Sequence, residues 1–247
     1  MKTRFSRTLE TVLKHPISRL LSPLLLTLTL ASDVRAQPAA TESDALSAEI
    51  HVVALETPGE ALWWRSPAGM ERISPSVQSL GPRLEAPGDR FELFRRVPDE
   101  KGEGFRHVPV GTARLLPEAA VQLVVILPYD QRGATYPIKI FDHSPETHPP
   151  NHVRFINLAP KPLGVQIMDT RSIVRPGDSL LHAYPDAGLE KIRMQIAIEA
   201  PEGWQKLAYR RFIVAPGVRF LFLAAPLSVS SGFDEAETAL VLRKFVD

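Results

Sequence analysis

Short apolar stretches separated by turn residues make up most of the chain beyond its first 48 residues. In Arg193–Glu199 apolar and polar residues alternate, which places Met194, Ile196 and Ile198 on one face of a strand. Val121–Leu127 is more continuously apolar, as expected of a central strand that is covered on both faces. Pro, Gly, Asp or Ser ends most stretches, a pattern typical of a β-sandwich or barrel.

The pattern predicts strands throughout and almost no helix. Asp234–Leu242 contains a helix-start sequence, but Leu240–Val246 returns to strand character and is predicted as a terminal strand. The other predicted strands are Ile50–Leu55, Ala61–Arg65, Arg90–Val97, Val110–Leu115, Val121–Leu127, Tyr136–Phe141, Val153–Leu158, Leu163–Met168, Ile192–Ala200, Gln205–Val214 and Val218–Ala224.

Two pairs of segments about one hundred residues apart resemble each other. Ala113–Pro128 parallels Arg211–Pro226, each a strand, a proline turn, a strongly apolar strand and a closing proline. Upstream, Glu49–Leu55 parallels His152–Leu158. This spacing is the size of a small sandwich domain and favours two similar domains in tandem, with chance similarity as the alternative.

A polar, proline-rich segment, Asp142–Asn151, separates two apolar strands and marks a boundary. The expected fold is therefore all-β, with two small β-sandwich (immunoglobulin-like) domains at residues 49–144 and 145–247. Each would have its own apolar core.

The N-terminal region has the order of a cleavable export signal. Residues 1–19 are basic on balance, Leu20–Ala31 is apolar, and the small residues Val34 and Ala36 precede the expected cut after residue 36. The apolar run is short compared with the ~20 residues of a transmembrane helix, although a retained membrane anchor is the alternative. Residues 37–48 are predicted to be a flexible linker. The mature protein would be periplasmic or secreted, with no membrane insertion after signal cleavage.

Composition narrows the range of functions. The 23 prolines among 247 residues favour short extended segments, and the absence of cysteine excludes disulfides and thiolate chemistry. Residues 1–36 hold six basic and two acidic residues, which leaves 23 basic and 26 acidic residues and a net charge near −3 after cleavage. A weakly acidic protein lacks the electrostatic signature of nucleic-acid binding.

The junction holds the densest group of polar side chains: Asp142, His143, Glu146, His148 and His152. Histidine and carboxylate can bind zinc, but the prolines at 149 and 150 exclude a helical face and no known ligand spacing is matched. An exposed linker is the favoured interpretation, and no metal site is predicted.

No catalytic motif stands out. The chain has no Gly-x-Ser-x-Gly elbow, no phosphate-binding loop and no dinucleotide fingerprint, and its carboxylates are not visibly paired. We therefore predict no catalytic residues, no cofactor and no enzyme activity. A hydrolase stays an alternative if His143, His148 or His152 converges with carboxylates in a cleft.

Trp63 and Trp64 are the candidate ligand-binding residues. As neighbours in a strand they should face opposite sides, one into the core and one outward. An outward tryptophan could stack on a sugar, with Tyr129 or Tyr136 nearby, or could pack against its own domain.

Phe141–Pro145 followed by Val153–Pro160 resembles a segment of uncharacterised exported proteins of verrucomicrobial and planctomycete-type bacteria. In those proteins an Asp-Ser-Pro segment precedes an Arg-Phe-x-Asn strand, here at Arg154–Asn157. The resemblance implies a periplasmic β-sandwich without an assigned activity. The tandem layout is also similar to that of the periplasmic accessory protein of alginate O-acetylation, an analogy of architecture alone.

The expected function is that of a non-catalytic exported binding or scaffold protein of the cell envelope. Its partner would be a protein, in envelope assembly or polysaccharide export. The alternatives are a carbohydrate-binding module that uses an exposed tryptophan, with polysaccharide as its ligand, and the junction hydrolase. Asn157 is expected to end its strand through a side-chain-to-backbone hydrogen bond.

Overall fold

The computed structural model describes residues 48–99, 102, 104–226 and 240–247, all of it strand, turn or irregular structure. The predicted signal, the linker up to residue 47 and the start of Asp234–Leu242 lie outside these residues. The strands are β1 (Ala48–Ala54), β2 (Leu62–Ser66), β3 (Gly69–Ile73), β4 (Arg83–Ala86), β5 (Arg90–Pro98), β6 (Phe105–Arg114), β7 (Val121–Ile126), β8 (Ile138–Asp142), β9 (His152–Asn157), β10 (Leu163–Ile167), β11 (Thr170–Val174), β12 (Ser179–Ala183), β13 (Glu190–Ala200), β14 (Gly203–Val214), β15 (Arg219–Pro226) and β16 (Leu240–Val246).

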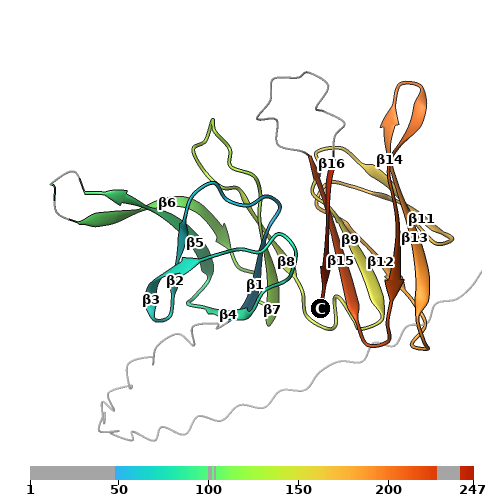
Figure 1. Cartoon of the computed structure of the whole chain (residues 1–247), viewed down its shortest axis with the longest axis horizontal. Helices are drawn as coiled ribbons and strands as arrows, with labels where there is room; N and C mark the ends of the chain where they lie inside the picture. The colour runs from blue at the N-terminus through green and yellow to red at the C-terminus, as the bar shows by residue number, and fades with distance from the viewer. Residues whose placement is uncertain (1–47, 100–101, 103, 227–239) are drawn as a thin grey trace, which may run out of the picture. The chain divides into compact units, whose positions relative to one another are not determined.

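The strands form four sheets of four, two in each half of the chain (Figure 1). The first half contains the sheets β4-β1-β7-β8 and β3-β2-β5-β6; the second contains β12-β9-β15-β16 and β11-β10-β13-β14. The fold is all-β with two sandwiches, as the sequence predicts. No sheet takes strands from both sides of the segment between β8 and β9.

The two sandwiches have the same topology, with each strand matched by the strand eight places later. The parallel pair β1–β7 joins Glu49 to Val121, and its counterpart β9–β15 joins His152 to Arg219. These are the positions that the two sequence similarities align. The shared order and register support the interpretation of an internal repeat.

A β-bulge recurs at matching positions in both sandwiches. Leu93 on β5 pairs with Gly111, and the next residue, Phe94, pairs with Pro109. On β13, Ile196 pairs with Ala208, and Ala197 pairs with Lys206. A bulge fixes the register of the strands around it. Each residue on the solvent-facing side of one sheet can therefore be assigned its counterpart in the other.

Each sandwich encloses its own apolar core. The first contains Trp64, Phe91, Leu93 and Ile126, and the second contains Phe155, Met194, Ile196 and Phe222. Along β13 the side chains alternate between buried and outward positions, as the period-two pattern predicts.

A third apolar cluster joins the sandwiches. It packs Val53, Leu123 and Val125 of the first against Ile156 and Leu223 of the second, together with Leu55, Leu80, Leu221, Ala225 and Phe245. Consequently β7 and β15 bury side chains on both faces, which confirms the expectation drawn from the continuous apolar run at Val121–Leu127. Within the described part of the chain no helix has the length and apolar character needed to cross a membrane.

Candidate ligand-binding site

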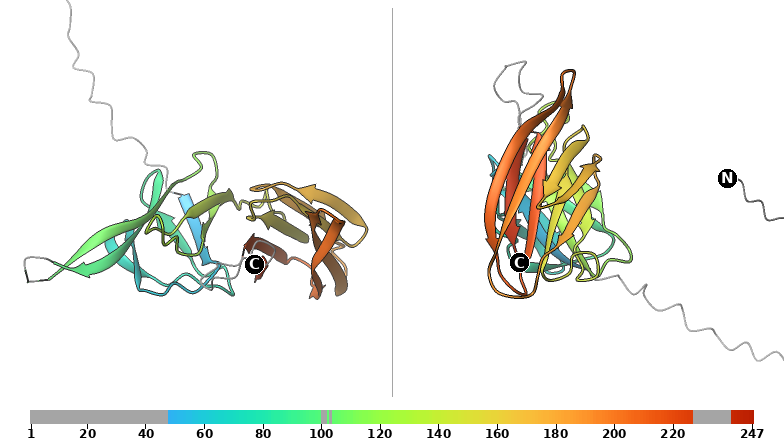
Figure 2. Two further views of the ribbon diagram at one scale, coloured as in Figure 1. Left: turned by 90° about the horizontal axis from the view of Figure 1, so that it is seen from above. Right: turned by 90° about the vertical axis from the view of Figure 1, so that its right-hand side faces the viewer.

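The outward face of the sheet β11-β10-β13-β14 carries the strongest candidate site. In the right-hand view of Figure 2 the long strands β13 and β14 of this sheet lie in orange at the front. One row of paired residues across the sheet is Ile173, Gly164, Ala197 and Lys206. The next row is Arg171, Gln166, Gln195 and Tyr209.

The six-membered ring of Trp204 lies against Gly164 on this face. Trp204 projects from β14, yet its ring reaches across β13 to β10, where a Cβ on Gly164 would lie only 2.8 Å from Cζ3 of the ring. Ala197, between them, has a side chain small enough to let the ring pass. Trp204 nevertheless keeps 47% of its surface exposed. Exposed aromatic surface is therefore available for stacking.

The first sandwich fills the equivalent space with its own side chains. The counterparts of Gly164 and Ala197 are Trp63 and Phe94, which pair with each other on β2 and β5. His107, the counterpart of Trp204, packs edge-on against the Trp63 ring with centroids 5.2 Å apart. The two sandwiches share one topology but differ on this row. The first carries the large side chains Trp63 and Phe94, whereas in the second Gly164 and Ala197 leave room that the ring of Trp204 partly fills.

The neighbouring row differs in a similar way. In the first sandwich Arg65 and Glu92 form an ion pair of 3.0 Å. Their counterparts are the amides Gln166 and Gln195, paired in register on β10 and β13. The Gln166 oxygen accepts a hydrogen bond from Nε of Arg171 at 3.0 Å. Amides offer both donors and acceptors, the capacity that hydroxyl-rich ligands require.

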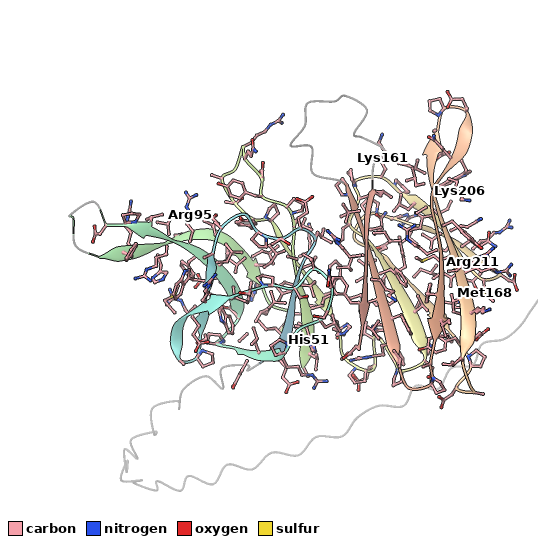
Figure 3. The ribbon with its side chains drawn as sticks, viewed as in Figure 1. His51, Arg95, Lys161, Met168, Lys206 and Arg211 are labelled. Atoms are coloured by element: carbon pink, nitrogen blue, oxygen red, sulfur yellow. The ribbon has the colours of Figure 1, made fainter. Side chains whose placement is uncertain are left out.

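Three adjoining hollows line this face, with volumes of about 550, 250 and 530 Å³. Gln166 and Gln195 line both the first and second, and Met168 and Arg193 line both the second and third. We call this surface the outer-face groove, and the outward-facing residues that line it are Gly164, Gln166, Met168, Asp169, Arg171, Ile173, Lys191, Arg193, Gln195, Ala197, Trp204, Lys206, Tyr209, Arg211 and Ile213. Figure 3 shows Met168, Lys206 and Arg211 along the same side of the second sandwich.

The two predicted tryptophans do not form a binding surface. As expected, they face opposite sides: Trp64, with 4% exposed, lies in the core against Phe91 and cannot meet a ligand. Trp63 lies on the outer face, but His107 and the Arg96 guanidinium, 5.5 Å from the ring centroid, pack against it. Trp64 was therefore wrong as a ligand-binding residue, and Trp63 belongs to no exposed row of rings.

The tyrosines expected near that site pack against each other instead. The rings of Tyr129 and Tyr136 lie 5.0 Å apart, and Tyr136 is buried in the first core. They add no aromatic row to the first sandwich.

The junction segment is partly buried, contrary to the prediction of an exposed linker. His143 and His148 have no exposed surface, and their ring centroids are 5.3 Å apart. Nε2 of His143 lies 3.6 Å from an Asp247 carboxylate oxygen, and Asp247 also contacts Arg219. The Arg219 guanidinium donates to the carbonyls of His143 and His148 at 3.3 and 3.1 Å. The C-terminus and β15 thus cover what the sequence alone presents as a polar loop.

Burial makes the junction histidines poor proton carriers near neutral pH. Burial, together with the positive charge of Arg219, lowers the pKa of His143 to about 3. Burial and the neighbouring His143 ring lower the pKa of His148 to about 3 as well. Both imidazoles are therefore neutral, and they contribute to packing at the junction.

The geometry gives no support to a metal site or a hydrolase at the junction. Among the described residues, no group of three or more histidines and carboxylates could hold a metal ion. The Ser144 hydroxyl donates to the Thr147 hydroxyl at 3.3 Å, and among the described residues no histidine ring forms a hydrogen bond with it. The absence of enzyme activity remains a prediction.

Sequence reasoning missed Trp204, Gln166, Gln195 and Arg171. The internal repeat contains a signal for this site: when β10 is aligned with β2, Gly164 takes the position of Trp63. The sequence alone does not determine the register of that alignment, because the β-bulges that fix it are seen only in the structure.

Comparison with known proteins assigns no family. No family model matches the chain, and no curated protein matches it significantly.

Proposed function

We propose that this protein is a non-catalytic exported binding protein of the bacterial cell envelope, and that it binds a glycan chain in the outer-face groove. The observation that carries the proposal is the half-exposed ring of Trp204, which lies over the small residues Gly164 and Ala197 where the first sandwich has Trp63 and Phe94. A sugar ring has an apolar face of the same character as those side chains. It would lie on the exposed side of Trp204, with its hydroxyls facing the two amides.

Replacing Trp204 with Ala is expected to weaken glycan binding at least tenfold, because the stacking surface is lost. The measurement is retardation of the protein, expressed from its full-length sequence, in gels containing dextran, hydroxyethylcellulose, galactan or polygalacturonate. Phe105→Ala is the matched control, because Phe105 is also an exposed aromatic residue but lies in the first sandwich. Retardation by none of these glycans, or equal retardation of wild type and Trp204→Ala, would refute the proposal.

The variant Ala197→Phe is expected to abolish glycan binding while the fold is retained. It places in β13 the residue that β5 has at the same position, where it would occupy the path of the Trp204 ring. Thermal unfolding followed by circular dichroism should show a melting temperature close to that of wild type, since the site faces outward. A folded Ala197→Phe protein that binds as well as wild type would show that the Trp204 ring over Ala197 is not the site.

A protein partner is the second candidate for the same face. Ile173 and Ile213, 62% and 55% exposed, line its two outer hollows and offer apolar contacts that a glycan does not need. The double variant Ile173→Ser, Ile213→Ser distinguishes a protein partner from a glycan ligand. Loss of captured envelope protein with glycan binding intact would favour a protein partner, and the reverse pattern would favour the glycan.

A further inference from the structure

The outer-face groove is strongly cationic in a chain whose overall charge is close to neutral. Arg171, Lys191, Arg193, Lys206 and Arg211 line its three hollows, whereas Asp169 is the one acidic residue among the lining side chains. Such a local excess of one sign over a concave surface concentrates ions of the opposite sign.

In the part of the chain that the structure describes, no carboxylate forms an ion pair with these cations. Among the described residues, neither Arg171 nor Arg211 forms an ion pair: Nε of Arg171 donates to the Gln166 amide, and Nε of Arg211 donates to the Tyr209 hydroxyl at 2.7 Å. The Lys206 ammonium lies 5.0 Å from the Tyr209 ring centroid. In the first sandwich, by contrast, Glu92 pairs with Arg65 on the corresponding row. The difference between the halves therefore includes charge as well as space.

Resting on the proposed function, we infer that the ligand is an acidic glycan, whose sugar rings stack on Trp204 and whose carboxylates are bound by Arg171, Arg193, Lys206 and Arg211. Guanidinium groups hold carboxylates through paired N–H donors, and Arg171 and Arg211 each keep further N–H donors beyond the one hydrogen bond of Nε. The amides Gln166 and Gln195 remain for hydroxyl groups between the charges.

An acidic peptide fits this surface less well. Peptides that add to a sheet bind along the edge strands, here β11 and β14, through backbone hydrogen bonds. The aromatic, amide and cationic groups instead lie on the face and extend across all four strands. A flexible chain of rings that carries charge along its length matches this arrangement.

The test compares polygalacturonate, polyglucuronate and hyaluronan with their carboxyl-reduced neutral forms by isothermal titration calorimetry. At least one acidic glycan is expected to bind ten or more times more tightly than its reduced form, and its affinity should fall as salt is raised. The double variant Arg193→Gln, Arg211→Gln should bring the affinity for the acidic form close to the affinity for the reduced form. Lys161→Gln, outside the groove, is the control.

The possible outcomes distinguish this inference from the proposed function. Equal binding of acidic and reduced forms, with loss in Trp204→Ala, would overturn the acidic ligand and leave glycan binding in place. Binding of none of the six glycans would overturn the acidic ligand, and it would overturn glycan binding as well if the gel glycans also fail to retard the protein. Equal affinity for single-stranded poly-dT or for poly-glutamate would show general polyanion binding and would also overturn the inference.

Discussion

Lowering the pH from 7 to 5 is expected to destabilise the protein by about 4 kcal/mol through His143 and His148 alone, because their pKa values in the folded chain are about 3. In the unfolded chain both imidazoles take up protons near pH 6.5. Their contribution to stability is therefore complete above pH 6.5 and is lost progressively as the pH falls towards 3. At the middle of this range the two sites give a slope of about 3 kcal/mol per pH unit. His51, whose pKa is also lowered by burial, acts in the same direction.

Urea unfolding followed by tryptophan fluorescence at pH 7, 6, 5 and 4 measures this dependence. His148→Gln is the informative variant, since an amide can still donate to the His152 carbonyl that His148 Nε2 contacts at 3.3 Å. Its slope should fall by roughly half, because one of the two strongly shifted sites is removed. An unfolding midpoint that stays constant between pH 7 and 5 would show that the histidines are not held neutral by burial.

Asn157→Ala is expected to lower the free energy of unfolding by about 3–5 kcal/mol, because it leaves buried backbone groups without partners. Nδ2 of Asn157 donates to the carbonyls of Lys161 and Val174, both at 2.9 Å, and its Oδ1 accepts from the backbone N–H of Ala159 at 2.8 Å. The side chain is fully buried. Asn157 thus makes the side-chain-to-backbone bonds expected at the end of its strand.

Chemical denaturation at pH 7 measures the Asn157 effect, with Gln195→Ala as the control. Gln195 is an exposed amide on β13, and its loss should change stability by no more than about 0.5 kcal/mol. The residue that corresponds to Asn157 in β1 is Ala54, so an alanine fits a strand of this type sterically. Equal stability of Asn157→Ala and wild type would show that the three hydrogen bonds contribute nothing net.

All twelve strands predicted from the sequence are present, whereas β3, β4, β11 and β12 were missed. These four are edge strands of four or five residues, one in each sheet. An edge strand pairs on one side only and can stay largely exposed, as β3 does, with Ile73 its one buried residue. Its apolar pattern is consequently too weak to distinguish it from a turn.

The candidate site was harder to predict than the fold, because it depends on which side chains are absent. Gly164 and Ala197 look like ordinary strand residues, and they stand out only when they are compared with Trp63 and Phe94 at the equivalent positions of the first sandwich. Conversely, Trp64 was predicted as a ligand-binding residue because it is large and aromatic, but its large side chain fills the core of the first sandwich. The burial of the polar junction could not be predicted for a further reason. His143 is covered by Arg219 and Asp247, which lie 76 and 104 residues further along the chain.

The most direct test of glycan binding in the outer-face groove is an NMR titration of ¹⁵N-labelled protein with an oligogalacturonide. The signals followed are the indole N–H resonances of the protein's tryptophans. The chain contains three tryptophans, so each resonance can be assigned by substitution. The account predicts that the Trp204 signal shifts on binding, while those of buried Trp64 and covered Trp63 stay in place. Binding with the Trp204 signal unchanged, or with the Trp63 signal shifted instead, would contradict it.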